Sequence, residues 1–145
     1  MSTVVSPHSI QPPATLSIAR INVMRAGYAL MAVGLVAVKW PLLPDAHDRP
    51  LYESVTICML VAMSLLALLG LRYPVKLLPL LLFESAWKLI WLAAVALPLA
   101  VGGPGLDQRT TDVLTNCSLV VVILAVTPWE YTWRSIVKAA GDPWR

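Results

Sequence analysis

The sequence predicts an all-α integral membrane protein, a four-helix bundle followed by a C-terminal amphipathic helix at the membrane interface. Hydrophobic residues make up 58% of its 145 residues and charged residues 13%, whereas soluble domains average about 25% charged. The apolar residues fall into four blocks, each close to the ~20 residues that cross a ~30 Å hydrocarbon core. The alternating ten-residue segments of outer-membrane barrels are absent, which favours helices.

The apolar blocks divide the chain into three parts. Residues 1–19 form a polar tail, residues 20–127 form the four-span bundle, and residues 128–145 form an interfacial helix and a second tail. The spans are expected at about 22–43, 54–71, 75–100 and 112–126. Because a polar tail precedes the first block and no clean cleavage site follows it, we expect that span to be retained rather than removed as a signal peptide.

Lysine and arginine residues are distributed unevenly between the two sides of the bundle. One side carries seven, which are Arg20, Arg25, Arg72, Lys76, Arg134, Lys138 and Arg145. The other side carries three, Lys39, Arg49 and Arg109, diluted by several acidic residues. Since cytoplasmic loops are enriched in positive residues, both termini are predicted to be cytoplasmic.

The second and third blocks are joined by a very short link that contains Gly70 and Pro74. Glycine suits a helix C-terminus and proline suits the first turn of a helix. We therefore expect Gly70 to end the second span, Pro74 to begin the third, and the two spans to pack as an antiparallel hairpin.

A new helix is predicted immediately after the fourth span. Thr127 and Glu130 have the spacing of a capping box, with Pro128 at the first helical position. An aromatic stripe with an adjacent basic stripe follows, formed by Trp129, Trp133, Arg134 and Lys138. Such a helix lies in the membrane interface and binds lipid headgroups. It is interpreted as a membrane anchor, with a specific lipid or partner site as the alternative.

An acid and a base lie well inside the third predicted span. Glu84 is eight residues beyond Lys76, hence roughly 12 Å along a helix axis from the boundary. Lys88 follows in the favourable i,i+4 order, and Trp87 and Trp91 fall beside the pair. An intramembrane charge is a functional-site hypothesis by default, but buried ion pairs also fix helix packing. Both interpretations remain open.

The remaining polar residues predict no cofactor or metal site. Both histidines, His8 and His47, lie outside the spans, which excludes paired-histidine haem ligation within the bundle. Cys58 and Cys117 are interpreted as small apolar residues, since a disulfide requires proximity. Neither phosphate-binding and catalytic motifs nor a nucleic-acid-binding pattern is found. The expected partners are membrane lipids, with a homo-oligomer or a larger membrane partner as further candidates.

Two segments carry a resemblance to a known group of proteins. They are Leu81-Leu82-Phe83-Glu84-x-x-Trp87-Lys88-x-Ile90-Trp91-Leu92 and the ending Gly141-Asp142-Pro143-Trp144-Arg145. This pattern resembles small bacterial proteins that have four predicted membrane spans and no established activity. The resemblance implies a bacterial inner-membrane setting and assigns no residue roles. Size and span count are also similar to the DoxX-like group, which is an analogy at the level of fold alone.

Three classes of function are compatible with these residues. The first, which we favour, is a non-enzymatic membrane component, an accessory subunit or an oligomeric bundle, indicated by small-residue spacing such as Ala96-x-x-x-Ala100. The second is a transporter or channel for a small ligand or protons, with Glu84 and Lys88 lining the path. The third is a membrane enzyme acting on a lipid or quinone, with Glu84 as acid or base, although no nucleophile or metal set accompanies it.

Overall fold

The structure is a computed structural model that describes residues 16–102 and 107–139. Within these ranges all regular structure is helical, which confirms the all-α prediction. Four stretches are long and apolar enough to cross a membrane: Ile18–Leu42, Leu51–Arg72, Leu78–Gly102 and Gln108–Val126. The expectations for most of the N-terminal tail and for the ending 141–145 lie outside the described residues.

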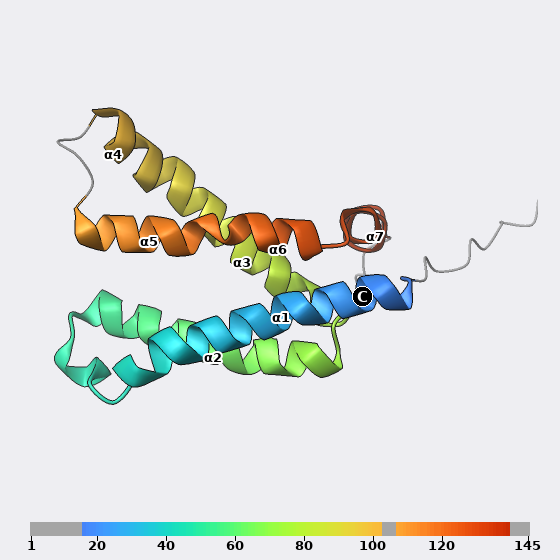
Figure 1. The fold of residues 1–145 in the computed structure, drawn as a ribbon, viewed down its shortest axis with the longest axis horizontal. Helices are drawn as coiled ribbons and strands as arrows, with labels where there is room; N and C mark the ends of the chain where they lie inside the picture. Colours follow the sequence, from blue (N-terminus) through green and yellow to red (C-terminus); the bar gives the residue numbers. More distant parts are fainter. Residues whose placement is uncertain (1–15, 103–106, 140–145) are drawn as a thin grey trace, which may run out of the picture.

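The first two long helices form the closest pair in the molecule. Helix α1 (Ile18–Lys39) begins at Ser17, whose hydroxyl accepts a hydrogen bond from the backbone nitrogen of Arg20 at 3.3 Å. It continues into a short 3₁₀ turn, η1 (Trp40–Leu42). After a second turn, η2 (Ala46–Asp48), helix α2 (Leu51–Arg72) returns alongside α1. The two helices lie side by side in the lower half of Figure 1.

The third long helix contains a π-helical turn that the sequence analysis did not predict. Helix α3 (Leu78–Trp91) passes through η3 (Leu92–Ala96) into α4 (Leu97–Gly102). Pro98 lacks a backbone N–H and its ring crowds the carbonyl four residues earlier, so the helix widens before it. Figure 1 shows α3 and α4 running diagonally across the other helices rather than alongside α2.

The fourth long helix is interrupted at Leu119, between α5 (Gln108–Ser118) and α6 (Val120–Val126). The Ser118 hydroxyl donates to the Thr115 carbonyl at 2.7 Å, and the backbone nitrogen of Leu119 bonds to the Asn116 carbonyl instead. Side-chain hydroxyls compete in this way with the helical ladder. The Asn116 carbonyl in this turn also accepts a hydrogen bond from Lys88 on α3.

The chain changes direction at Pro128. Helix α7 (Trp129–Thr132), continued by the π-helical η4 (Trp133–Val137), is viewed down its axis in Figure 1 while α5 and α6 run across the view. The predicted capping box is wrong, because the Thr127 hydroxyl donates back to the Ile123 carbonyl at 2.8 Å. Pro128 is the N-cap of α7 and not its first helical residue, so that prediction is also wrong. The missing backbone N–H of Pro128 accounts for the new start.

The link between α2 and α3 also differs from its prediction. Gly70 does not end a helix, since α2 continues to Arg72. A Cβ atom at Gly70 would lie 2.5 to 2.7 Å from the Tyr28 ring, so the glycine allows α1 and α2 to approach closely. Pro74 lies in a turn before α3, and Pro79 occupies the first turn instead. The hairpin opens, because α3 turns away from α2 toward α5 and α6.

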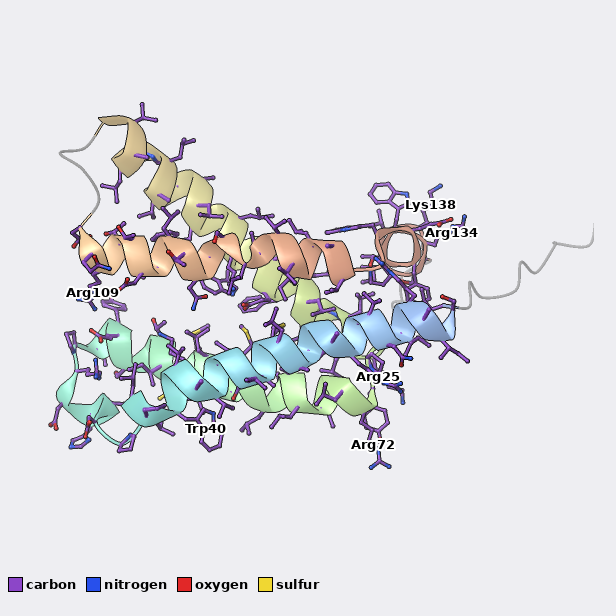
Figure 2. All side chains as sticks on the ribbon, in the orientation of Figure 1. Arg25, Trp40, Arg72, Arg109, Arg134 and Lys138 are labelled. Atoms are coloured by element: carbon purple, nitrogen blue, oxygen red, sulfur yellow. The ribbon has the colours of Figure 1, made fainter. Side chains whose placement is uncertain are left out.

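Charged groups gather at the two ends of the long helices. Arg25, Arg72, Arg134 and Lys138 lie toward one end in Figure 2, and Arg109 lies at the other. Between them, large apolar side chains remain exposed, including Val33 at 69%, Ile90 at 66% and Val121 at 67%. Apolar sides between charged ends are typical of helices that cross a bilayer.

Candidate functional site

The buried face of α3 carries the acid and the base that the sequence singled out. Leu81, Glu84, Ser85 and Lys88 recur every three or four residues and are all buried. Glu84 is 2% exposed and Lys88 is 5% exposed. Since this face turns toward α1, α5 and α6, the pair lies inside the helix assembly and not on its apolar outer surface.

Both oxygens of the Glu84 carboxylate have donors from the same helix. Lys88 Nζ lies 2.9 Å from Glu84 Oε1, and Trp87 Nε1 donates to Glu84 Oε2 at 2.7 Å. Charge-assisted bonds of this kind are roughly twice as strong as neutral ones. The local i,i+4 geometry of α3 therefore builds most of the site without help from other helices.

The Lys88 ammonium also binds a neighbouring helix. Its Nζ donates to the backbone carbonyl of Asn116 at 3.3 Å, in the last turn of α5. A cation is favourable there because the C-terminal end of a helix carries partial negative charge. The same Nζ lies 5.6 Å from the centroid of the Trp87 ring, within cation–π range. Lys88 thus connects α3 to α5.

Two cavities meet at the Glu84 carboxylate. One, of about 430 Å³, lies between α1, α2, α3 and α5 and includes Trp91, which is thereby placed in the same site as Glu84. The other, of about 160 Å³, includes Lys88 and extends along α1. Glu84 and Asn116 line both cavities. The larger cavity also contains Lys39, the last residue of α1, and Asp112, near the beginning of α5.

The site contains both a negative and a positive side chain, and both line the smaller cavity. The ammonium group and the indole N–H both contact the carboxylate, and a backbone carbonyl accepts a further hydrogen bond from the ammonium group. Groups of this type can bind a small zwitterion or relay a proton, and they can equally hold two helices in register. The predicted site residues, Glu84, Trp87, Lys88 and Trp91, all lie on α3. The Asn116 carbonyl could not be predicted from the sequence, because every residue has a backbone carbonyl.

No protein-family model, curated protein or solved structure matches this chain.

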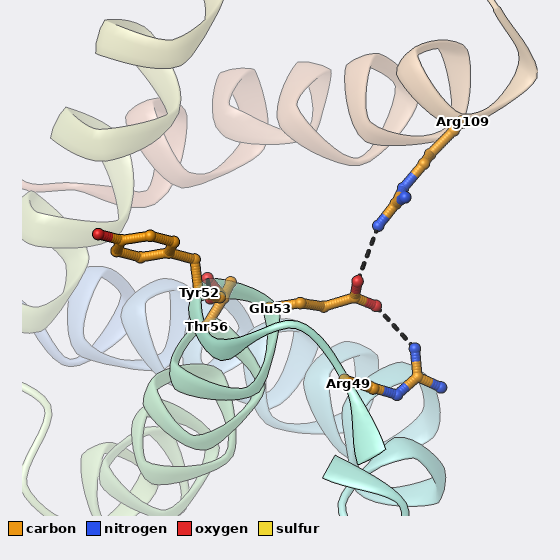
Figure 3. Close-up of polar contacts among 5 residues, drawn as sticks. All are labelled: Arg49, Tyr52, Glu53, Thr56 and Arg109. Carbon is orange, nitrogen blue, oxygen red and sulfur yellow. Dashed lines mark hydrogen bonds and ion pairs between the residues drawn. The ribbon is translucent and has the colours of Figure 1, made fainter. Parts of the chain in front are cut away.

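A second polar cluster, which was not predicted, lies at the beginning of α2 and of α5. Figure 3 shows Glu53 between two arginines, with Arg49 NH1 at 2.7 Å and Arg109 NH2 at 3.0 Å. The Arg49–Glu53 pair has i,i+4 spacing and was detectable. Arg109 lies 56 residues from Glu53, so only the fold brings it near.

The first turn of α5 is capped next to this cluster. Asp107 Oδ1 accepts a hydrogen bond from the Thr110 backbone nitrogen at 2.9 Å. Hydrogen bonds from the side chain and backbone of Thr110 hold the pKa of Asp107 below its ordinary value. An ionised carboxylate at this position also complements the positive end of the helix.

Two arginines at the opposite end cap the ends of other helices. Arg20 NH2 donates to the Thr127 carbonyl at 2.6 Å, and Arg25 Nε donates to the Leu71 carbonyl at 3.1 Å. The buried Tyr28 hydroxyl donates to the Pro74 carbonyl at 2.9 Å. In the sequence, both arginines indicated only the orientation of the bundle. They also attach α1 to the ends of α6 and α2.

The residues of the proposed anchor lie on the exposed side of the helix that follows Pro128. The Trp129 and Trp133 rings are 50% and 56% exposed. The Trp129 indole nitrogen donates to the Leu124 carbonyl at 2.8 Å, so its position is fixed. Arg134 pairs with Glu130 at 2.6 Å, and Lys138 follows at the end of η4.

The cysteines do not pair, and no metal centre is found among the described residues. Cys58 is exposed and Cys117 is buried, and both are free. Residues 16–102 and 107–139 contain no cluster of three or more histidine, cysteine or acidic side chains suited to a metal ion.

Proposed function

We propose that this chain is a non-enzymatic component of the bacterial inner membrane, in which Glu84 and Lys88 lock α3 against α5. The observation that carries the proposal is the reciprocal bonding of the pair. Both Glu84 oxygens accept hydrogen bonds from α3 itself, and Lys88 also donates a hydrogen bond to the Asn116 carbonyl on α5. A buried ammonium held in this way fixes the register of α3 against α5, because separating the two helices would break its hydrogen bond to the Asn116 carbonyl.

The orientation that we propose places both termini in the cytoplasm. Arg25, Arg72, Arg134 and Lys138 lie toward one end of the helices, and the positive-inside rule assigns that end to the cytoplasm. The exposed indoles of Trp129 and Trp133 then lie at headgroup depth, where they anchor α7 and η4 along the inner surface. The exposed apolar sides of the long helices provide area for lipid, a second copy or a larger membrane partner.

A complementation experiment tests the role of the pair. A strain lacking the gene is complemented with Glu84→Gln/Lys88→Met, which removes both charges and retains similar side-chain volumes. If the pair has only a structural role, replacing both members together is close to neutral for stability. The variant should then rescue the measurable phenotype of the deletion, provided that immunoblots show normal abundance. The matched control is Glu130→Gln/Arg134→Met, an exposed pair with the same i,i+4 spacing, which should also rescue.

The cavity at Glu84 favours a second candidate, a path or binding site for a small ligand or protons. Its volume of about 430 Å³ and the presence of Lys39 and Asp112 give it charged groups at two depths. On this candidate the Glu84→Gln/Lys88→Met protein is present at normal abundance but fails to rescue. If only this variant fails and the exposed-pair control rescues, the result would favour a ligand or proton site over a structural role for Glu84 and Lys88.

A further inference from the structure

An apolar groove separates α2 from the beginning of α3. It consists of a cavity of about 480 Å³ and a second of about 170 Å³, and Met59, Met63 and Phe83 line both. Ala62 also lines the larger cavity, and the smaller cavity reaches Trp87. The groove exists because α3 turns away from α2 toward the fourth long helix. Glu84 does not line either of these two cavities.

A positive charge marks the other end of the groove. Lys76 is its one charged lining residue among those described. Lys76 Nζ and Arg72 Cζ lie 5.5 and 5.6 Å from the centroid of the Tyr73 ring, which holds both cations at the link. The sequence contains no acidic residue from Ser54 to Phe83. The described ion pairs also leave Lys76 and Arg72 without an acidic partner.

The length of the groove matches one leaflet of a bilayer. On α2 it extends from Thr56 to Leu66, a rise of roughly 15 Å at 1.5 Å per residue. This is about half of the ~30 Å hydrocarbon thickness. Lys76 lies at its end, next to Tyr73, at the depth where an interfacial tyrosine meets the headgroups.

We propose that the groove binds one acyl chain of an anionic phospholipid whose phosphate contacts Lys76. The apolar lining accommodates the chain, and the cations at the link complement the headgroup. A second copy of this protein fits less well, because a two-fold contact through the groove would bring Arg72 and Lys76 of both copies together at the same end. Like charges in that arrangement repel.

Lipid binding to the full-length protein tests the site. The protein is purified in mild detergent and titrated with palmitoyl-oleoyl phosphatidylglycerol or with phosphatidylcholine of the same chains, and bound lipid is counted by native mass spectrometry. Lys76→Gln should weaken phosphatidylglycerol binding about fivefold, which corresponds to the ~1 kcal/mol of one cation near an anionic headgroup. Ala62→Phe should weaken it at least as much, because the ring fills the groove.

Two control variants separate this site from general membrane affinity. Arg109→Gln removes an exposed cation at the opposite end of the long helices, and Ala94→Phe enlarges an exposed alanine on η3. Both should bind phosphatidylglycerol as the wild type does. Circular dichroism checks that each variant is folded, and Ala62→Leu replaces Ala62→Phe if the larger side chain unfolds the protein.

Three results would overturn the proposal. Equal binding of the two lipids would show that Lys76 does not recognise the anionic headgroup. Unchanged binding by the folded Ala62 variant would show that the acyl chain does not occupy the groove. Conversion of a dimer to a monomer by that variant, measured by light scattering, would identify the occupant as a second copy. None of these outcomes depends on the role of Glu84, so the groove and the proposed lock can fail separately.

Discussion

At the scale of single residues, the physical problem of this protein is a charge held away from water. Glu84 and Lys88 neutralise each other, yet each also needs further polar contacts, and Trp87 and Asn116 supply them. The pair is tolerated because its bonding is complete and its net charge is zero. Removing one member leaves the other uncompensated, which makes the two substitutions strongly dependent on each other.

A double-mutant cycle measures this dependence. Glu84→Gln and Lys88→Met should each destabilise the detergent-solubilised protein by about 3 to 5 kcal/mol, whereas the double replacement should be closer to neutral. Thermal unfolding followed by tryptophan fluorescence gives the three melting temperatures. The cycle on Glu130 and Arg134, an exposed pair, should show little coupling. Additive losses at Glu84 and Lys88 would mean that the two residues do not interact.

A second prediction at this scale concerns Gly70. Gly70→Ala should destabilise the protein by about 1 to 3 kcal/mol, because the new methyl group overlaps the Tyr28 ring. The ring has little freedom to move, since Tyr28 is fully buried and its hydroxyl is bonded to Pro74. Thermal unfolding again provides the measurement.

Gly34→Ala is the matched control for Gly70→Ala. It lies on the same pair of helices, and a Cβ atom there meets nothing within 4 Å. Alanine stabilises a helix interior by roughly 1 kcal/mol relative to glycine, so this variant should melt at the wild-type temperature or above it. Equal effects of the two substitutions would contradict the close approach of α1 and α2.

At the scale of elements, cations capping helix C-termini connect the helices. Lys88 does this for α5, Arg25 for α2 and Arg20 for α6. The last carbonyls of a helix have no intrahelical partner, and a cation both bonds to them and complements the helix dipole. This pattern explains why α1 contributes two arginines near its N-terminus to the ends of other helices.

Loss of the Arg20 cap should loosen the junction between α6 and α7. Arg20→Met removes the guanidinium donor from the Thr127 and Ala125 carbonyls, so amide hydrogen exchange in residues 125–132 should accelerate. A destabilisation of about 1 kcal/mol is expected for a partly exposed charge-assisted bond. Arg134→Met, which breaks only an exposed pair, should leave the exchange of this junction unchanged. Equal acceleration in both variants would contradict the cap.

At the scale of the whole molecule, the two ends of the long helices have different chemistry. The end with Arg20 and Arg25 is basic and closed by caps, whereas the other end joins α2 to α5 through the Arg49–Glu53–Arg109 cluster. The apolar sides between the ends suit a bilayer about 30 Å thick. The distribution of positive charge predicts which end is cytoplasmic.

Cysteine labelling tests the orientation. In a background with Cys58→Ser and Cys117→Ala, Asp45→Cys should react with a membrane-impermeant maleimide in intact cells, and Lys138→Cys should not. Lys138→Cys should react after the cells are permeabilised, which shows that the thiol is accessible. Labelling of Lys138→Cys in intact cells would invert the proposed topology.

The sequence by itself determined the helical class, the four apolar stretches and the local geometry of α3. Glu84, Trp87 and Lys88 meet because they lie three or four residues apart on one helix, and this spacing depends only on helix geometry. The break at Pro128 likewise follows from a missing backbone N–H. The π-helical turn before Pro98 has the same local cause, although it was not predicted. Such features are local, so no neighbouring helix is needed to predict them.

Only the tertiary structure decided which helices touch. Arg109 reaches Glu53, Lys88 reaches the Asn116 carbonyl, and Gly70 faces Tyr28 rather than ending a helix. Buried and lipid-facing apolar residues look alike in a sequence, because lipid tails are as apolar as leucine and give little hydrophobic preference for either side. The crossing of the helices, and with it the cavity at Glu84 and the groove at Met63, depends on close packing between distant segments that composition does not encode.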